Sequence, residues 1–183
     1  MRFKSLFTAI LCLLPTALLA HWQPGGTADY NWGPFHVYTV SLYTETGSYK
    51  ENQTPVMLSF DYAKPVEGKN FAITLIKEMG PLHIDNAKTE KWLAELQQVL
   101  PDCSPSGRLN YIALENSGYF VLKDQVLDHQ FDAEFNRAFM DLWVSGTTAF
   151  ATLKDPLTGK TEVKASELEP KQSEVAPMQE DDA

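Results

Sequence analysis

Hydroxyl and amine side chains near the ends of two predicted strands are the first candidates for chemistry in this sequence. Tyr38 lies within the segment FHVYTVSLY, and Tyr62 and Lys64 close the segment VMLSFDYAK. At the mouth of a cleft, two hydroxyl groups and a cation could orient the polar end of a small ligand. The structural alternative is a core tyrosine whose oxygen reaches a backbone partner, a sheet-edge tyrosine and a solvated lysine. Both interpretations stay open at this point.

Histidine and acidic residues give no strong catalytic or metal-binding pattern. His36, His83 and His129 lack a metal-ligand spacing such as H-x-x-x-H. His21 differs, because cleavage after Ala20 would place its imidazole beside a new α-amino group, a pair that can chelate copper. No carboxylate pair stands out as an acid and base couple, and the sequence contains no G-x-S-x-G, P-loop or dinucleotide motif. We therefore expect no cofactor, and copper binding through His21 is the third-ranked hypothesis.

The first 20 residues have the pattern of a secretory signal peptide. Arg2 and Lys4 precede the apolar run LFTAILCLLPTALLA, which ends with the small residue Ala20. This run is too short to act as a membrane anchor. We predict cleavage after Ala20, a periplasmic or secreted protein, and no membrane-spanning segment in the exported chain.

Acidic residues outnumber basic ones. The 183 residues include 15 Lys or Arg and 24 Asp or Glu, and removal of Arg2 and Lys4 changes the net charge from −9 to −11. The chain has no basic stripe that could neutralise phosphates, which argues against nucleic acid as a partner. Residues 161–183 contain seven acids, two lysines and few large apolar side chains, so we predict a disordered acidic tail.

The remaining residues, 21–160, are enough for one domain with a substantial core. Cys103 is the only cysteine left after signal removal, so no intramolecular disulfide can form. We expect an inert thiol near a proline-rich turn. A reactive or intermolecular thiol is the alternative.

Alternating and β-branched segments predict an antiparallel sheet. Residues 26–43 read as a pair of strands joined by a Gly33-Pro34 turn, and residues 56–62 as a further strand. Residues 108–122 predict a β-hairpin around the turn ENSG, followed by a brief extension at residues 126–127.

The segments between and after these strands show the apolar periodicity of helices. Residues 68–79 predict a helix that stops at Gly80, and Asp85 can cap the next helix, which ends before Pro101. Asp132 can cap a further helix, and residues 144–153 predict a last short one. The order of strands and helices predicts an α+β fold with helices packed on an antiparallel sheet.

Short motifs spread over residues 22–155 carry a family resemblance. In chain order they are GPFHVYTVSLY, LSFDY, IKEM, KWLAEL, SGRL, FDAEFNRAFMDLW and VSGTT. Their order and spacing resemble the chalcone isomerase-like family, in particular its exported bacterial branch. The resemblance implies an open-faced β-sandwich, a large antiparallel sheet covered on one side by helices, with a cleft between the two layers.

The resemblance also implies which positions would contact a ligand. Isomerases of the family use an arginine, a tyrosine, an asparagine and threonines to hold and polarise the substrate, and fatty-acid-binding members use an arginine against a carboxylate. The first three positions align with Asp29, Phe71 and Glu78, and one threonine position falls near Tyr38. A carboxylate in place of the cation would repel an anionic substrate, so isomerase chemistry is not expected.

The sequence thus predicts a periplasmic, non-catalytic chalcone isomerase-like domain. It would bind a small, partly apolar ligand, fatty-acid-like or aromatic, or a protein partner. The candidate residues of the cleft are Tyr38, Tyr62, Lys64, Asp29 and Phe71. The alternative function is an isomerase or lyase-type enzyme that acts in the same cleft.

Overall fold

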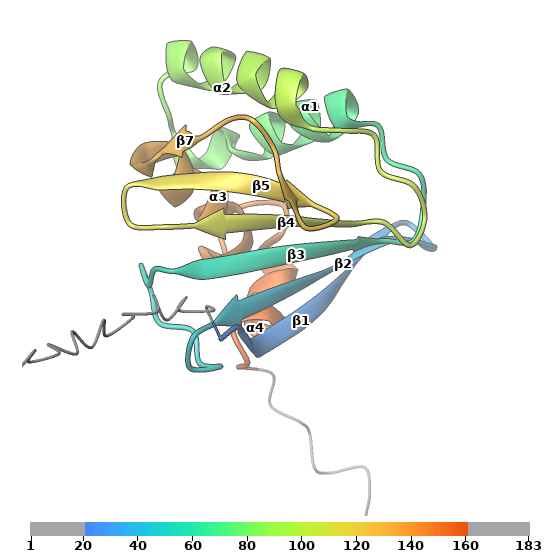
Figure 1. Cartoon of the computed structure of the whole chain (residues 1–183), viewed down its shortest axis with the longest axis vertical. Coiled ribbons are helices and arrows are strands. Elements are labelled where there is room, and N and C mark those ends of the chain that lie inside the picture. Colours follow the sequence, from blue (N-terminus) through green and yellow to red (C-terminus); the bar gives the residue numbers. More distant parts are fainter. Residues whose placement is uncertain (1–20, 161–183) are drawn as a thin grey trace, which may run out of the picture.

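The structure is a computed structural model, and it describes residues 21–160. These residues build one antiparallel sheet with helices on one of its faces (Figure 1). The predicted α+β class is therefore confirmed. The predicted signal peptide, residues 1–20, and the predicted acidic tail, residues 161–183, lie outside the described residues. None of the helices within residues 21–160 has the length and apolar composition that a membrane crossing requires.

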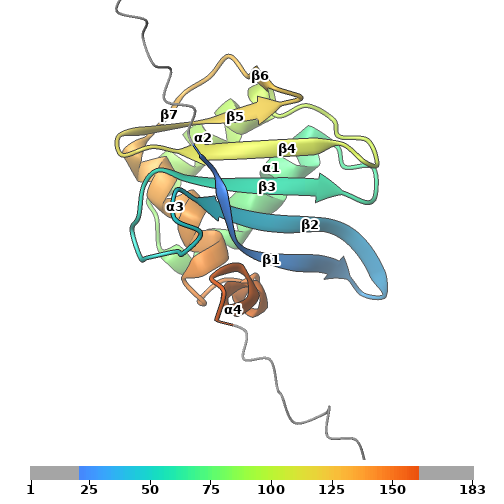
Figure 2. The same cartoon turned by 60° about the horizontal axis from the view of Figure 1, so that its bottom comes forward.

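Seven strands form the sheet, and the first six lie side by side in chain order. The strands are β1 (Gln23–Trp32), β2 (Phe35–Thr44), β3 (Val56–Tyr62), β4 (Arg108–Ala113), β5 (Ser117–Leu122), β6 (Gln125–Val126) and β7 (Phe131–Asp132). β7 pairs with β5, the strand that also carries β6. Figure 2 shows the β1–β2 turn at one end of the sheet and the β2–β3 connection at the opposite end.

Two helices lie between β3 and β4, and a further helix follows β7. The helical segments are α1 (Gly68–Glu78), η1 (Gly80–Leu82), α2 (Asn86–Val99), α3 (Ala133–Val144), η2 (Ala151–Leu153) and α4 (Lys154–Leu157). Asp85 caps α2 by accepting from the Ala87 N–H at 2.8 Å, and Asp132 caps α3 by accepting from the Phe135 N–H at 2.8 Å. Both predicted caps are confirmed, and each satisfies a backbone donor of a first helical turn.

The core lies between the helices and the inner face of the sheet. In β2, Tyr38, Val40 and Leu42 point inward and are buried, whereas Thr39 and Tyr43 on the outer face are half-exposed. This alternation is the ordinary period of two of a strand. The outer face carries no helix among the described residues (Figure 2).

The predicted last helix over residues 144–153 is wrong. α3 ends at Val144, and Gly146 then takes φ of 77°, a left-handed conformation that interrupts a helix. The Thr148 hydroxyl donates to the Leu142 carbonyl oxygen at 2.6 Å and so satisfies an acceptor of the last helical turn. The chain therefore turns back before it forms η2 and α4.

α4 packs against the start of the edge strand β1. A side chain at Gly26 would collide with the backbone carbonyl groups of Pro156 and Leu157. Only glycine allows the two backbones to approach this closely. The register of β1 against β2 also shifts between Pro24 and Gly26, so the strand is irregular where α4 meets it.

Candidate functional site

Three of the predicted cleft residues meet on the inner face of the sheet. Tyr38 from β2, Tyr62 from β3 and Phe71 from α1 have ring centroids 5.9 to 6.2 Å apart. Their exposed fractions are 3%, 3% and 5%. The structure thus brings these three residues together, but it buries them.

Other aromatic rings fill the space around this group. Phe60 lies 5.9 Å from Tyr38 and 5.2 Å from Trp143, and Trp143 stacks on Phe150 at 4.5 Å. Tyr30 stacks on Tyr38 from the side of β1 at 4.8 Å. Edge-to-face and stacked contacts at these distances are those of a close-packed core. At this point, side chains fill the gap between sheet and helices.

Asp29 points away from these rings. Its neighbour Tyr30 points inward, and strand residues alternate between faces, so the Asp29 carboxylate lies on the outer face. There the Thr39 hydroxyl donates to Asp29 Oδ1 at 2.7 Å, and His36 Nε2 lies 3.2 Å from the same hydroxyl oxygen. This corrects the prediction that Asp29 lines the same cleft as Tyr38, because a shift of one residue along a strand exchanges the two faces.

Lys64 and Glu78 lie at the periphery of the interior group. Lys64 is exposed in the loop after β3, where its backbone N–H donates to the Val37 carbonyl oxygen at 3.3 Å. Glu78 is half-buried at the end of α1.

Burial raises the pKa of Tyr38 well above its ordinary value, and the charges of two neighbouring tyrosines and of Glu78 add to this shift. Tyr38 therefore stays a neutral phenol at physiological pH.

The Tyr62 hydroxyl lies beside the Cys103 thiol in the core. Among the described residues the Tyr62 oxygen has no hydrogen-bond partner, and the Cys103 thiol donates weakly to the Pro101 carbonyl oxygen at 3.8 Å. Burial raises the pKa of the Tyr62 phenol and that of the Cys103 thiol. A thiol kept in its protonated form is a poor nucleophile, which agrees with the expected inert Cys103.

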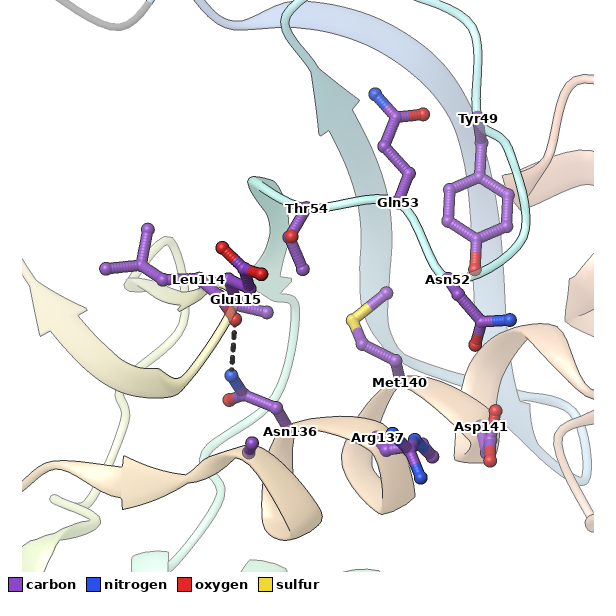
Figure 3. Close-up of a pocket in the computed structure, with 12 residues that line it drawn as sticks. Tyr49, Asn52, Gln53, Thr54, Leu114, Glu115, Asn136, Arg137, Met140 and Asp141 are labelled. Carbon is purple, nitrogen blue, oxygen red and sulfur yellow. Dashed lines mark hydrogen bonds between the residues drawn. The ribbon is translucent and has the colours of Figure 1, made fainter.

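A separate cavity opens beside α3, near the end of the sheet where β2 connects to β3 (Figure 3). Its volume is about 510 Å³, within the range of roughly 300–1,000 Å³ that is usual for small-ligand sites. The β2–β3 loop, the β4–β5 turn and one flank of α3 form its walls. Its larger lining side chains include Tyr49, Asn52, Glu115, Arg137, Met140 and Asp141.

Asn136 fixes the wall between α3 and the β4–β5 turn. Its Nδ2 donates to the carbonyl oxygens of Leu114 at 2.8 Å and Ser117 at 2.6 Å, and the Tyr111 hydroxyl donates to its Oδ1. Figure 3 shows the bond to Leu114 at the side of the cavity. A Cβ at Gly118 would collide with Asn136 Oδ1, so the turn also needs glycine there. Because both donors and the acceptor of the amide are used, Asn136 holds the wall and has little capacity left for a ligand.

The charges at the cavity are mixed. Arg137 and Asp141 lie one turn apart on α3, and Glu115 lies across the cavity on the β4–β5 turn (Figure 3). Burial raises the pKa of Asp141, the Arg137 charge opposes this shift, and Glu51 adds to it. Burial and the Asp141 charge also raise the pKa of Tyr49. Tyr49 therefore offers a neutral hydroxyl to a ligand.

The lining of the cavity combines several polar groups with apolar surface. It contains no histidine, cysteine or lysine, the residues that most often act as bases or nucleophiles near neutral pH. It does offer a guanidinium, carboxylates, amides and a phenol around the thioether of Met140. Such a lining can hold a small molecule that has an apolar body and a polar end.

His21 is exposed directly before β1. Within residues 21–160, no three His, Cys, Asp or Glu side chains gather closely enough to hold a metal ion. Copper binding through the terminal amine and imidazole of His21 stays a prediction that depends on the cleavage site.

A comparison with known proteins identifies a bacterial relative of substantial similarity. An uncharacterized protein of Haemophilus influenzae is 55% identical to this chain over 161 residues, which are 88% of this chain and 80% of the relative. The chain belongs to the family of that protein. Models of known protein families give no match to it. Because the relative is uncharacterized, the relationship assigns family membership without assigning an activity.

The sequence alone predicted nothing of the α3 cavity beyond one local hint. Asp141 reads as a solvated position on an amphipathic helix, and Tyr49 and Asn52 lie in a segment without periodicity. These residues meet only because three segments that are distant in the chain approach one another. The spacing of Arg137 and Asp141, four residues apart beside the apolar stripe of α3, is the one local hint.

Proposed function

We propose that this protein is an exported, non-catalytic binding protein with an open-faced β-sandwich of the chalcone isomerase-like type. The helical cover on one face of a large antiparallel sheet supports the architecture. The basic and apolar pattern of residues 1–20 supports export to the periplasm. The family resemblance of the motifs in residues 22–155 supports the relationship.

The ligand of this protein occupies the α3 cavity and not the gap between sheet and helices. The observation that carries this proposal is a contrast in packing: Tyr38, Tyr62 and Phe71 are at most 5% exposed, whereas an open cavity of about 510 Å³ lies along the flank of α3. Opening the interior to a ligand would require expulsion of several aromatic rings. Each such ring contributes about 3–5 kcal/mol to stability.

The lining defines the class of ligand. Met140 and the ring of Tyr49 present apolar surface, and Asn52 and Arg137 present polar groups. A small, partly apolar molecule with one polar or charged end, fatty-acid-like or aromatic, fits this combination. A guanidinium such as that of Arg137 pairs well with a carboxylate when the geometry allows two parallel hydrogen bonds.

Native mass spectrometry of the protein purified from its own periplasm tests this proposal. We expect a retained small molecule on the wild-type chain and its loss from the Met140→Trp variant, whose larger side chain fills the cavity. Ile73→Trp is the matched control, because it places the same new side chain on an exposed position of α1.

Three outcomes would contradict the proposal or a part of it. A wild-type chain without a bound mass, and without a thermal shift on addition of fatty acids or aromatic acids, would remove the ligand-binding function. Retention of the ligand by both variants would move the site elsewhere. Turnover of a chalcone measured by absorbance would overturn the non-catalytic part of the proposal.

A further inference from the structure

The β1–β2 turn carries two aromatic side chains that the fold leaves in water. Trp32 is 73% exposed and Phe35 is 57% exposed, and they are the two most exposed aromatic side chains within residues 21–160. They are register partners on either side of Gly33 and Pro34, so they lie together at the tip of the hairpin. Gly33 has φ of 58°, which allows the tight turn. Exposed Trp and Phe side chains at one point usually mark an interaction site.

The outer face of the hairpin behind this apolar tip is polar. The next register pair is Asn31 and His36, whose side chains lie 3.3 Å apart at Asn31 Oδ1 and His36 Nδ1. Behind it lies the pair Asp29 and Thr39, joined by the 2.7 Å hydrogen bond. Polar side chains that bond to one another thus cover the outer face of the hairpin behind the tip.

The size of the tip argues against a protein partner. A large aromatic side chain buries about 150–250 Å² when fully covered, so the exposed parts of Trp32 and Phe35 amount to roughly 300 Å². A stable protein interface needs about 800 Å² from each partner. A lipid bilayer makes no such demand, because it covers any apolar projection without matching its shape.

The geometry of the hairpin matches the depth of a membrane interface. A strand advances about 3.3 Å per residue, so Asp29 lies roughly 10 Å behind Trp32 along β1. Peripheral apolar groups enter a bilayer to about 5–10 Å, and tryptophan favours the headgroup region. We infer that Trp32 and Phe35 insert into the interfacial layer of a phospholipid bilayer and attach the exported protein peripherally to a membrane, with Asp29 left in water.

The nature of the lipid follows from the charges. Residues 21–183 carry a formal net charge of −11, so attraction to anionic headgroups cannot supply the binding. We therefore expect attachment to bilayers of zwitterionic phosphatidylcholine, driven by the two aromatic side chains. This inference is independent of the ligand in the α3 cavity, and either can fail alone.

Vesicle sedimentation with the chain from His21 to Ala183 tests the inference. We expect the wild-type chain to sediment with phosphatidylcholine vesicles, and the variant with Trp32→Ala and Phe35→Ala to lose at least about tenfold in partitioning. Ile73→Ala, which removes an exposed apolar side chain from α1, should leave partitioning unchanged. Lipids brominated near the headgroup should quench tryptophan emission of the wild-type chain and not that of Trp32→Ala.

Failure of the wild-type chain to sediment at millimolar lipid would overturn the inference. Equal sedimentation of the double variant would overturn it as well. If the wild-type chain self-associates in analytical ultracentrifugation and the double variant does not, the tip is a protein contact and the membrane assignment is wrong. Circular dichroism and thermal unfolding check that the variants are folded, and Trp32→Ser alone serves if the double variant is not.

Discussion

The packed interior and the α3 cavity both contain aromatic and other apolar side chains. They differ because neighbouring side chains fill the interior, whereas the cavity stays open. In the interior, rings from β2, β3 and α1 contact rings from α3, and Phe60 and Trp143 are fully buried. At the flank of α3, Tyr49 and Met140 stand beside an open volume, because the β2–β3 loop and the β4–β5 turn do not close over the helix. Aromatic residues on a strand face therefore indicate a core here, whereas the binding space arises where loops meet a helix flank.

The largest expected effect tests the packed interior. Phe71→Ala should lower the free energy of unfolding by about 3–5 kcal/mol, because the removed ring leaves a void among rigid neighbours. Urea unfolding followed by circular dichroism measures the change. Ile73→Ala on the same helix is the control and should stay within about 0.5 kcal/mol, because Ile73 is exposed. A loss at Phe71 of under about 1 kcal/mol would mean that the interior has slack space for a ligand.

The next effect tests the wall of the cavity. Asn136→Ala should cost about 2–4 kcal/mol, because it leaves the Tyr111 hydroxyl and the carbonyl oxygens of Leu114 and Ser117 without their partner. The same urea experiment measures it. Asn70→Ala is the control, since the Asn70 amide is exposed and bonds only to Glu67 at 2.7 Å in the described structure. Equal costs at both positions would show that water replaces the buried bonds and that the wall is loose.

A smaller expected effect compares the α3 cavity directly with the packed interior. Met140→Ala should cost about 1–2 kcal/mol, less than the 2–5 kcal/mol typical of a sealed core, because the new space joins a cavity that already exists. Thermal unfolding and urea unfolding of this variant and of Phe71→Ala give the ratio. A loss at Met140 as large as that at Phe71 would show that the cavity is closed in solution.

The smallest effect depends on pH. Burial raises the pKa of Asp141 in the folded protein, so the folded chain binds the proton more tightly than the unfolded chain. The contribution of Asp141 to stability is therefore complete below the unfolded pKa, about 3.9, and is lost as the pH rises through the folded pKa. Asp141→Asn should be slightly more stable than wild type at pH 7, and this difference should shrink towards pH 4. A difference in melting temperature that grows on acidification would contradict this sign.

The sequence predicted most elements because their patterns are local. The period of two in β2, the apolar stripes of α1 and α2, and the caps at Asp85 and Asp132 each depend on neighbours a few residues apart. The same reasoning failed at residues 144–153, where Gly146 and a hydroxyl bond from Thr148 redirect the chain. Local patterns could not show that the loop after β2 would leave an open cavity beside α3.

The candidate site could likewise be predicted only in part. Pattern and resemblance selected Tyr38, Tyr62 and Phe71, and the structure brings them within 6.2 Å of one another. Whether such residues line a cleft or fill it depends on the volume of every neighbour, including Phe150 from a distant segment. That sum of volumes cannot be read from one motif.

The contact of α4 with Gly26 has a consequence for how copies of the protein meet in a crowded compartment. An edge strand offers a row of unpaired amides and carbonyls on which another chain can grow as an added strand. The helix lies across the first part of β1, and the register shift beside Gly26 interrupts the regular spacing that a growing sheet needs. We therefore expect an added strand to find regular pairing positions only along the second half of β1.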